Sequence, residues 1–289
     1  MRNNGITKPI ILLHCKANEI EEYIKYNLDV TFCSLYDLSL LESILTVYNK
    51  NINLHIPVDT GMNRFGIKYI NDFECLIKQL TRYKHINLYG LYTHLYSNTK
   101  IQINNQFDKF TNFVDIADKY KYFPKKHYIS SGYIDSELID KQSDFVRIGI
   151  GNYTKTTQST TDCVELYSKV IETKNIIKGE IVGYNNMFVA PKNMNIAVVF
   201  GGYNDGISRN FIDYKVKICN RYYPIIAICM DVFFVNIYND TINENEDVQI
   251  LSIVDDIINI DTLAKSSKLS KHEILAGLKG RIKTIYKNK

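Results

Sequence analysis

Short apolar runs alternate with longer amphipathic segments over the first half of the chain, up to about residue 154. The runs have the length and composition of buried strands, and the segments between them repeat apolar residues at helical spacing. The pattern predicts strands at 9–13, 29–33, 53–58, 87–93, 127–130 and 145–148, and helices at 17–26, 36–49, 70–82, 102–120 and 135–140. Strands that alternate with helices indicate a parallel sheet with right-handed crossovers.

Several of the predicted strands end in glycines and in polar or charged residues. Arg64, His94 and Arg147 each lie at or just after the end of a strand. Active sites of barrels built from alternating strands and helices gather at the carboxyl ends of the strands, so this placement favours a barrel over an open sheet. Such a barrel closes with eight strands, whereas the pattern predicts six. The sequence therefore predicts an α/β fold, a (β/α)8-type barrel missing its first two strands.

The pattern changes after a polar segment at residues 155–162, and strands with short turns replace the alternation. Strands are predicted at 165–177, 181–190, 195–201, 214–218, 224–229 and 232–238, followed by a polar loop at 239–247 and helices at 261–268 and 271–285. We therefore expect two domains, a partial barrel over residues 1–154 and a β-rich C-terminal domain over residues 155–289.

Composition narrows the class of protein. The 35 basic and 31 acidic side chains give a net charge of +4, which provides no argument for binding nucleic acid or an anionic membrane. The six cysteines have spacings that match neither a zinc site nor a redox pair, so free thiols and no metal are expected. No apolar window has the length of a membrane span, and the N-terminus carries no signal sequence. A cytoplasmic protein is predicted.

The most informative stretch is Val-Asp-Thr-Gly-Met-Asn-Arg-Phe-Gly-Ile at residues 58–67, which places Arg64 on a glycine-broken turn. An ordered set of motifs follows it: Gly-Leu-Tyr-Thr-His at 90–94, Ser-Ser at 130–131, Val-Arg-Ile-Gly-Ile at 146–150, Gly-Glu-Ile-Val-Gly-Tyr at 179–184, Gly-Tyr-Asn-Asp-Gly at 202–206 and Cys-Met-Asp at 229–231. The set resembles the alanine racemases, which are pyridoxal-phosphate enzymes, and it covers nearly the whole chain. Taken alone, each motif is also consistent with an ordinary turn, strand end or core position.

The resemblance implies a cofactor site in the first domain. His94 resembles the histidine packed over the cofactor ring, and Arg147 resembles the arginine at the pyridine nitrogen. An arginine there keeps the nitrogen unprotonated, which suits a racemase because it weakens the electron sink. Ser131 and the backbone amides of Gly149 and Ile150 resemble the phosphate cradle, in which glycine permits close approach of the backbone.

The resemblance also assigns the substrate-binding and catalytic groups. Arg64 and the backbone N–H of Met230 resemble the groups that hold the substrate carboxylate, for which a bidentate arginine is well suited. Tyr184 resembles the catalytic tyrosine, which the family supplies from the second subunit of a head-to-tail homodimer. The residues that resemble the entrance to the site are Tyr203, Asp205 and Arg209.

The chain departs from the family pattern at several positions. Pro57 stands where a lysine is frequent, Ala227 where an arginine is frequent, and Gly280 where a tyrosine is frequent. Ser130 stands where the family usually has asparagine. These departures leave the substrate amino acid open.

The lysine that would bind the cofactor covalently has no clear counterpart. Lys16 begins a Lys-Ala-Asn sequence similar to that of the family, but Glu-Ile-Glu-Glu follows it and its position relative to Asp59 is wrong. Lys16 is therefore interpreted as a lysine at the start of a helix. The lysine segment is expected before residue 1, and the chain as printed is expected to be inactive.

Three hypotheses remain. The first is an alanine racemase that interconverts L- and D-alanine for cell-wall precursors and carries pyridoxal 5'-phosphate. The second is a racemase of serine or another small amino acid. The third is a non-catalytic truncated remnant, which would serve only as a dimerisation partner. Barrel-type decarboxylases with a β domain fit less well, because the motifs at 202–206 and 229–231 indicate racemases.

Overall fold

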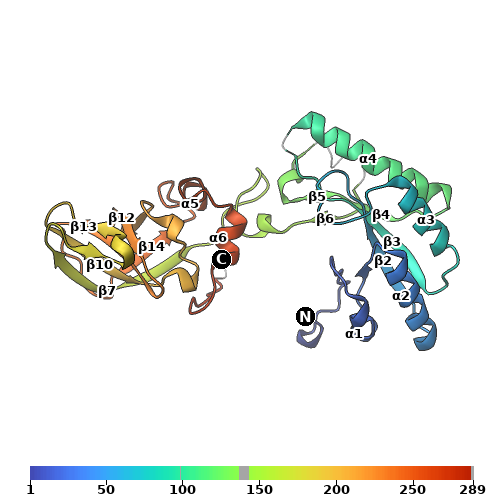
Figure 1. Cartoon of the computed structure of the whole chain (residues 1–289), viewed down its shortest axis with the longest axis horizontal. Coiled ribbons are helices and arrows are strands. Elements are labelled where there is room, and N and C mark those ends of the chain that lie inside the picture. The colour runs from blue at the N-terminus through green and yellow to red at the C-terminus, as the bar shows by residue number, and fades with distance from the viewer. Residues whose placement is uncertain (98, 137–142, 288–289) are drawn as a thin grey trace. The chain divides into compact units, whose positions relative to one another are not determined.

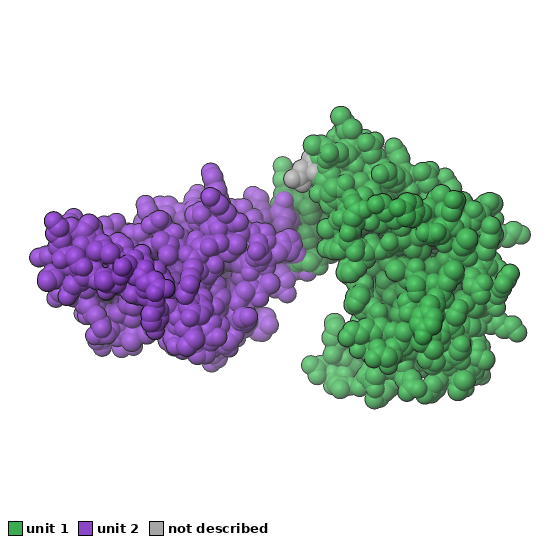
Figure 2. All heavy atoms as spheres, in the orientation of Figure 1, with its two compact units in different colours: residues 1–149, 157–159 green, residues 150–156, 160–289 purple. Residues whose placement is uncertain are grey.

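The computed structural model describes residues 1–97, 99–136 and 143–287. It divides into two compact units, shown in different colours in Figure 2. Unit 1 comprises Met1–Gly149 with Thr157–Ser159, and unit 2 comprises Ile150–Thr156 with Thr160–Lys289. Among the described residues, no helix combines the length and the apolar character needed to cross a membrane.

Unit 1 is built on a parallel sheet whose four strands lie side by side in chain order. They are β1 (Val30–Thr31), β2 (Ile52–Pro57), β3 (Ile86–Tyr92) and β4 (Lys125–His127). A second parallel pair joins β5 (Ile129–Ser130) to β6 (Val146–Arg147). Sequential parallel neighbours are the arrangement of a βα barrel wall, so the predicted α/β fold of this half is confirmed.

The helices between the strands are α1 (Ile20–Lys25), α2 (Leu35–Tyr48), α3 (Ile70–Leu80) and α4 (Lys100–Lys119), and Figure 1 shows the three longer ones along one side of the sheet. Short 3-10 turns are η1 (Arg2–Asn4), η2 (Ala17–Glu19) and η3 (Ser131–Tyr133). Local capping fixes where two helices begin. The Ser34 hydroxyl accepts from the backbone N–H of Asp37 before α2, and Thr99 does the same for Gln102 before α4.

One predicted strand of unit 1 is wrong. Residues 9–13 form only an isolated bridge, in which Ile11 pairs with Asp29. Its two hydrogen bonds run from Leu12 N–H to the Asp29 carbonyl and from Asp29 N–H to the Ile10 carbonyl. Because proline has no N–H, Pro9 cannot extend this pairing. The predicted helix at 135–140 falls largely outside the described residues.

Apolar side chains of the strands and helices meet in one core. Phe73 of α3 and Phe113 of α4 pack edge to face with ring centroids 5.2 Å apart. The other fully buried members include Leu38, Leu41, Leu45, Leu54, Ile56 and Leu91. Burial of these apolar side chains stabilises the strands, and so holds in place the strand ends that carry the polar residues.

Unit 2 is a closed six-stranded antiparallel barrel in the order β10-β13-β12-β11-β14-β7. Its strands are β7 (Leu166–Ile176), β10 (Met194–Phe200), β11 (Lys215–Ile218), β12 (Arg221–Ile228), β13 (Val232–Tyr238) and β14 (Asp247–Leu251). Its remaining elements are β8 (Ile181–Val182), β9 (Phe188–Val189), η5 (Ile150–Asn152), η6 (Tyr184–Asn186), η7 (Tyr203–Asp205), η8 (Arg209–Phe211), α5 (Ile260–Ser267) and α6 (Lys271–Gly277). A β-rich second half is confirmed.

Three details of unit 2 differ from the prediction. The strand predicted at 181–190 is a hairpin, since Gly183, Asn185 and Asn186 have positive φ and turn the chain between β8 and β9. Strand β14 was not predicted, because its five residues follow a polar loop and are too few to show a clear alternation of apolar and polar side chains. The last helix ends at Gly277 rather than 285, and Gly280 beyond it adopts the left-handed conformation.

The Phe73→Ala substitution should reduce the free energy of unfolding by about 3–5 kcal/mol, because it leaves a cavity beside Phe113 in a region without solvent access. Chemical denaturation of the two proteins measures this difference. Phe123→Ala is the matched control, since Phe123 is 77% exposed and its loss should change the value by less than about 0.5 kcal/mol. Equal effects of the two substitutions would contradict the assigned core.

Candidate functional site

The turn after β2 is held by hydrogen bonds within the turn itself. Val58 pairs with Ile67, and the Asp59 carboxylate accepts hydrogen bonds from Gly61 N–H at 2.8 Å and Asn63 N–H at 3.1 Å. Gly66 has φ of +108°, and a Cβ there would lie 2.9 Å from the Pro57 carbonyl group. Glycine is therefore required for the return of the chain. The turn holds the backbone of Arg64 at the carboxyl end of a parallel strand.

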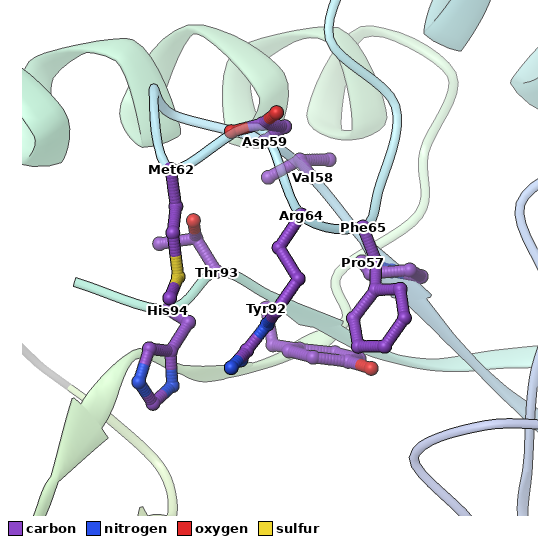
Figure 3. Close-up of a pocket in the computed structure, with 9 residues that line it drawn as sticks. All are labelled: Pro57, Val58, Asp59, Met62, Arg64, Phe65, Tyr92, Thr93 and His94. Atoms are coloured by element: carbon purple, nitrogen blue, oxygen red, sulfur yellow. The ribbon is translucent and has the colours of Figure 1, made fainter. Parts of the chain in front are cut away.

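A pocket opens between this turn and the end of β3. Figure 3 shows the side chains of Met62, Arg64 and Phe65 extending from the turn toward Tyr92 and His94. The complete lining is Pro57, Val58, Asp59, Met62, Arg64, Phe65, Tyr92, Thr93 and His94. The pocket therefore brings together Arg64 and His94, two of the residues that the sequence predicted.

Arg64 is exposed, and within the described part of the chain its guanidinium makes no ion pair or hydrogen bond. It lies 5.3 Å from the centroid of the Phe65 ring. A planar guanidinium with its donors open to solvent suits a carboxylate or phosphate that enters the pocket.

Arg147 lies at the end of β6 and is held rigidly. One terminal nitrogen contacts His127 Nδ1 at 2.8 Å and donates to the His127 carbonyl, and the other donates to the Thr93 carbonyl at 2.6 Å. The guanidinium also packs on the Tyr92 ring, 5.1 Å from its centroid. Burial lowers the pKa of Arg147 to about 10, and the charge of Arg64 acts in the same direction. Two neighbouring cations favour an anionic ligand.

Two buried histidines extend inward from Arg147. His127 Nε2 lies 3.0 Å from His55 Nδ1, and His55 Nε2 lies 3.8 Å from the Asp29 carboxylate. Burial, followed by the charge of Arg147, lowers the pKa of His127 to about 2, so this ring is neutral. Because a guanidinium only donates, His127 Nδ1 must accept, and its proton sits on Nε2. That proton is donated to His55 Nδ1, which leaves the proton of His55 on Nε2, facing Asp29.

Gly90 makes room for this row of histidines. A Cβ on Gly90 would overlap the imidazole of His55, so no other residue fits beside the ring in this arrangement. The glycine lies in the middle of β3 and its φ is not positive, so its role is to provide space rather than a special turn.

Ser131 and Gly149 meet where β5 and β6 end. The Gly149 N–H donates to the Ser131 hydroxyl at 2.9 Å. A Cβ built on Gly132 or Gly149 would have nothing within 4 Å, so the backbone here borders open space. Unit 1 thus brings together Arg64, His94, Ser131, Arg147 and Gly149 at the ends of its strands, whereas Ile150 begins η5 of unit 2.

Unit 2 carries the other predicted residues. Tyr184 begins η6 and is 65% exposed, and Met230 lies in the tight turn between β12 and β13, closed by Cys229 N–H to the Val232 carbonyl at 2.8 Å. The Arg209 guanidinium lies 5.0 Å from the centroid of the Tyr203 ring. Asp205 is buried and bonded to Arg281.

The positions that depart from the family pattern have simple environments. Pro57 lines the pocket beside Arg64, and Ala227 lies beneath Gly183. Lys16 caps η2, which leads into α1, and its ammonium lies 3.7 Å from Glu19. The interpretation of Lys16 as a lysine at the start of a helix is confirmed. Among the described residues that line the pocket, none is a lysine.

Comparisons with known proteins agree with this geometry. Residues 1–156 match the family model "Alanine racemase, N-terminal domain" and residues 163–286 match "Alanine racemase, C-terminal domain". The chain belongs to the alanine racemase family. The predicted family, an isomerase family, is therefore confirmed.

Individual relatives cover most of the chain. It is 31% identical over 284 residues to an alanine racemase of Borreliella burgdorferi, which covers 93% of this chain and 75% of the relative. A solved alanine racemase from Clostridium difficile 630 has a TM-score of 0.85 and 25% identity, covering 96% of this chain and 76% of its own. The alanine racemase from Streptomyces coelicolor superposes with a TM-score of 0.91 at 20% identity, covering 99% and 80%. These structures share the two-part fold.

Sequence reasoning did not find the row of histidines. The signal was available, since His55 and His127 lie on the predicted strands at 53–58 and 127–130, on either side of the strand predicted at 87–93. Histidine within a strand is weak evidence by itself, and only the register of β2, β3 and β4 places both rings beside Gly90. All six cysteine thiols are free, as predicted. Within the described ranges, no group of three or more potential metal ligands is present.

The Gly90→Ala substitution should lower the free energy of unfolding by about 1–3 kcal/mol, because the added methyl group displaces His55 from a close-packed site. Thermal and chemical unfolding measure the loss. Gly132→Ala is the matched control, since its Cβ would enter open space. A fully stable Gly90→Ala protein would contradict the row of histidines.

His127 should make stability fall with acidity. Its pKa is about 2 in the folded chain against about 6.5 for an unperturbed histidine, so below pH about 6 the unfolded state binds a proton that the folded state does not. Between the unfolded and the folded pKa, the free energy of unfolding should therefore fall by about 1.4 kcal/mol for each pH unit of acidification. Unfolding of the protein and of His127→Gln between pH 7 and 4 measures it. Identical pH profiles would rule out the neutral buried ring.

Proposed function

We propose that the chain carries the cofactor and substrate sites of a pyridoxal-phosphate-dependent alanine racemase, an enzyme that supplies D-alanine for cell-wall precursors in the cytoplasm, and that the printed residues alone are inactive. The observation that carries the proposal is that two arginines lie at the carboxyl ends of strands in unit 1, Arg147 half-buried and hydrogen-bonded, Arg64 exposed in the pocket. Membership in the family supports the reaction class. The free thiols agree with a reducing compartment.

The residues of unit 1 fit the non-covalent requirements of the cofactor. Arg147 would face the pyridine nitrogen, His94 would pack on the ring, and Ser131 with the Gly149 backbone would hold the phosphate. Open space at Gly132 and Gly149 supports the phosphate position, because an anion can approach the backbone closely there. Bound pyridoxal phosphate would supply the electron-withdrawing ring that acidifies the α-proton of the amino acid.

The row of histidines explains how Arg147 would act on the ring nitrogen. His127 and the carbonyls of His127 and Thr93 accept from the guanidinium, so its charge is fixed in place and cannot be lost near neutral pH. A guanidinium that donates a hydrogen bond to the ring nitrogen would occupy its lone pair and so disfavour protonation of that nitrogen. Such a partner favours return of the α-proton over transamination.

Arg64 would bind the substrate carboxylate together with the backbone N–H of Met230. Tyr184, from the partner subunit of a head-to-tail homodimer, would move the proton on one face of the substrate. Its wide exposure and its place after Gly183 support a role at an interface. Tyr203 and Arg209, stacked on each other, would line the entrance.

Serine is the second candidate substrate. Pro57, Ala227 and Gly280 replace larger polar or aromatic side chains of the family pattern, and a less crowded entrance would admit a hydroxymethyl group. Because no lysine lines the described pocket, the residues present supply neither a covalent attachment nor a proton-transfer group on the second face.

Titration of the purified protein with pyridoxal phosphate tests the proposal. We expect saturable binding seen by absorbance and fluorescence, weakened at least about tenfold by Arg147→Met, which corresponds to about 1.4 kcal/mol. Arg82→Met, which removes an exposed arginine elsewhere in unit 1, should leave binding unchanged. Absence of binding would favour the non-catalytic alternative.

Racemisation of L-alanine and L-serine by the same samples then tests the reaction. For the chain as printed we expect no measurable D-alanine or D-serine, since the pocket lacks a lysine. If either product forms, borohydride reduction and peptide mapping will identify the lysine used, and modification of Lys16 would overturn its assignment as a helix cap. The preferred amino acid in that case decides between the two substrates.

A further inference from the structure

The turn that carries Met230 is bonded to the loop at residues 201–207 along its length. Gly201 N–H donates to the Asp231 carbonyl at 2.8 Å, Tyr203 N–H to the Cys229 carbonyl at 3.0 Å, and Asn204 N–H to the Met230 carbonyl at 3.2 Å. A Cβ on Gly202 would overlap the carbonyls of this turn, so only glycine permits the contact. The loop therefore determines where the Met230 backbone lies.

Asp205 holds that loop from inside. It is 1% exposed, and its carboxylate accepts from Gly202 N–H at 3.0 Å. Arg281 binds the same carboxylate with both ends of its fork, Nε to Oδ1 at 3.0 Å and Nη2 to Oδ2 at 2.6 Å. The hydrogen bonds from Arg281 lower the pKa of Asp205, so the carboxylate is charged near neutral pH. Two parallel charge-assisted bonds make this a strong, directional pair.

Arg281 also contacts the turn directly. Its Nη2 donates to the Asp231 carbonyl at 3.3 Å and lies 3.3 Å from the Asp231 carboxylate. The guanidinium packs on Phe200 at 4.5 Å from the ring centroid. The backbone adds a further link, since Lys279 N–H donates to the Asp205 carbonyl at 3.2 Å. The segment after α6 is thus tied both to the loop and to the turn.

The Met230 N–H itself is free to bind a ligand. Within the described residues it has no hydrogen-bond partner, although the Met230 carbonyl and both neighbouring residues are bonded. A turn that is anchored through its carbonyls and leaves one amide open presents that amide in a fixed direction.

We propose that Asp205 and Arg281 are positioning residues, which hold the turn at residues 229–231 so that the Met230 N–H points in one direction. Its relevance to a substrate carboxylate rests on the function proposed above for Met230. Removal of Arg281 leaves the Asp205 carboxylate buried and unpaired, and the loop must open to hydrate it. The turn then loses its three anchors together.

Selective 15N labelling of methionine tests this coupling. The chain has five methionines, and the four beyond the N-terminus (Met62, Met187, Met194 and Met230) report on separate places. In Arg281→Met, which adds one labelled methionine at position 281, we expect the Met230 resonance to shift and broaden while those of Met62, Met187 and Met194 stay in place. Hydrogen exchange at Tyr203 and Asn204 should become at least about tenfold faster. Arg281→Lys, which keeps the charge but not the fork, should give an intermediate shift.

Arg221→Met is the matched control, because it also adds one labelled methionine and removes an arginine paired with Asp240 at 2.8 Å elsewhere in the same barrel. It should leave Met230, Tyr203 and Asn204 unchanged. If Arg281→Met unfolds the barrel, Asp205→Asn keeps the side-chain volume and weakens the same pair. An unchanged Met230 resonance in a folded Arg281→Met or Asp205→Asn protein would overturn the proposal.

Titration of the unsubstituted protein with acetate tests the carboxylate-binding role of Met230 separately from the positioning role of Asp205 and Arg281. A saturable shift of the Met230 resonance supports its role toward a carboxylate. The lack of any shift would count against that role in the proposed function, while the Arg281 variants would still decide whether the pair positions the turn.

Discussion

The partial burial of one permanent positive charge, that of Arg147, determines the hydrogen bonding around the strand ends of unit 1. Arg147 cannot lose its proton near neutral pH, so every buried group around it must accept hydrogen bonds or lie flat against it. The carbonyls of Thr93 and His127 and the imidazole of His127 fill the first role, and the Tyr92 ring fills the second. Because the His127 ring accepts on one side, it must donate on the other, and His55 lies there. Gly90 follows as the residue that leaves room for His55.

The same constraint leaves the pocket positive. Within the described ranges no carboxylate forms an ion pair with Arg147 or Arg64, and the one acidic residue of the lining, Asp59, is used to close its own turn. Two cations near one another raise the free energy of the empty pocket, and an anion relieves it. This charge would favour the phosphate or carboxylate of the ligands proposed above.

In unit 2, hydrogen bonds hold the turns at the edge of the small barrel. Gly202 permits the close approach of the loop at 201–207 to the turn at 229–231, and the buried Asp205 of that loop pairs with the exposed Arg281. Hydrogen bonds between main-chain groups join the loop to the turn. The side chains of Tyr203 and Arg209 nearby are exposed.

The sequence alone determined the family, the two-part α/β and β-rich organisation, and the residues at the strand ends, because the spacing of motifs survives in the chain and apolar periodicity depends only on local geometry. The sequence also predicted most helices and strands. It failed where the paired segment is short, at residues 9–13 and at β14, and where the chain reverses direction, in the β8–β9 hairpin. Tertiary structure alone decided the row from Arg147 through His127 to His55 and the pairing of Asp205 with Arg281. Those contacts join residues 20 to 76 positions apart, and only strand register and burial, which no local pattern encodes, bring them together.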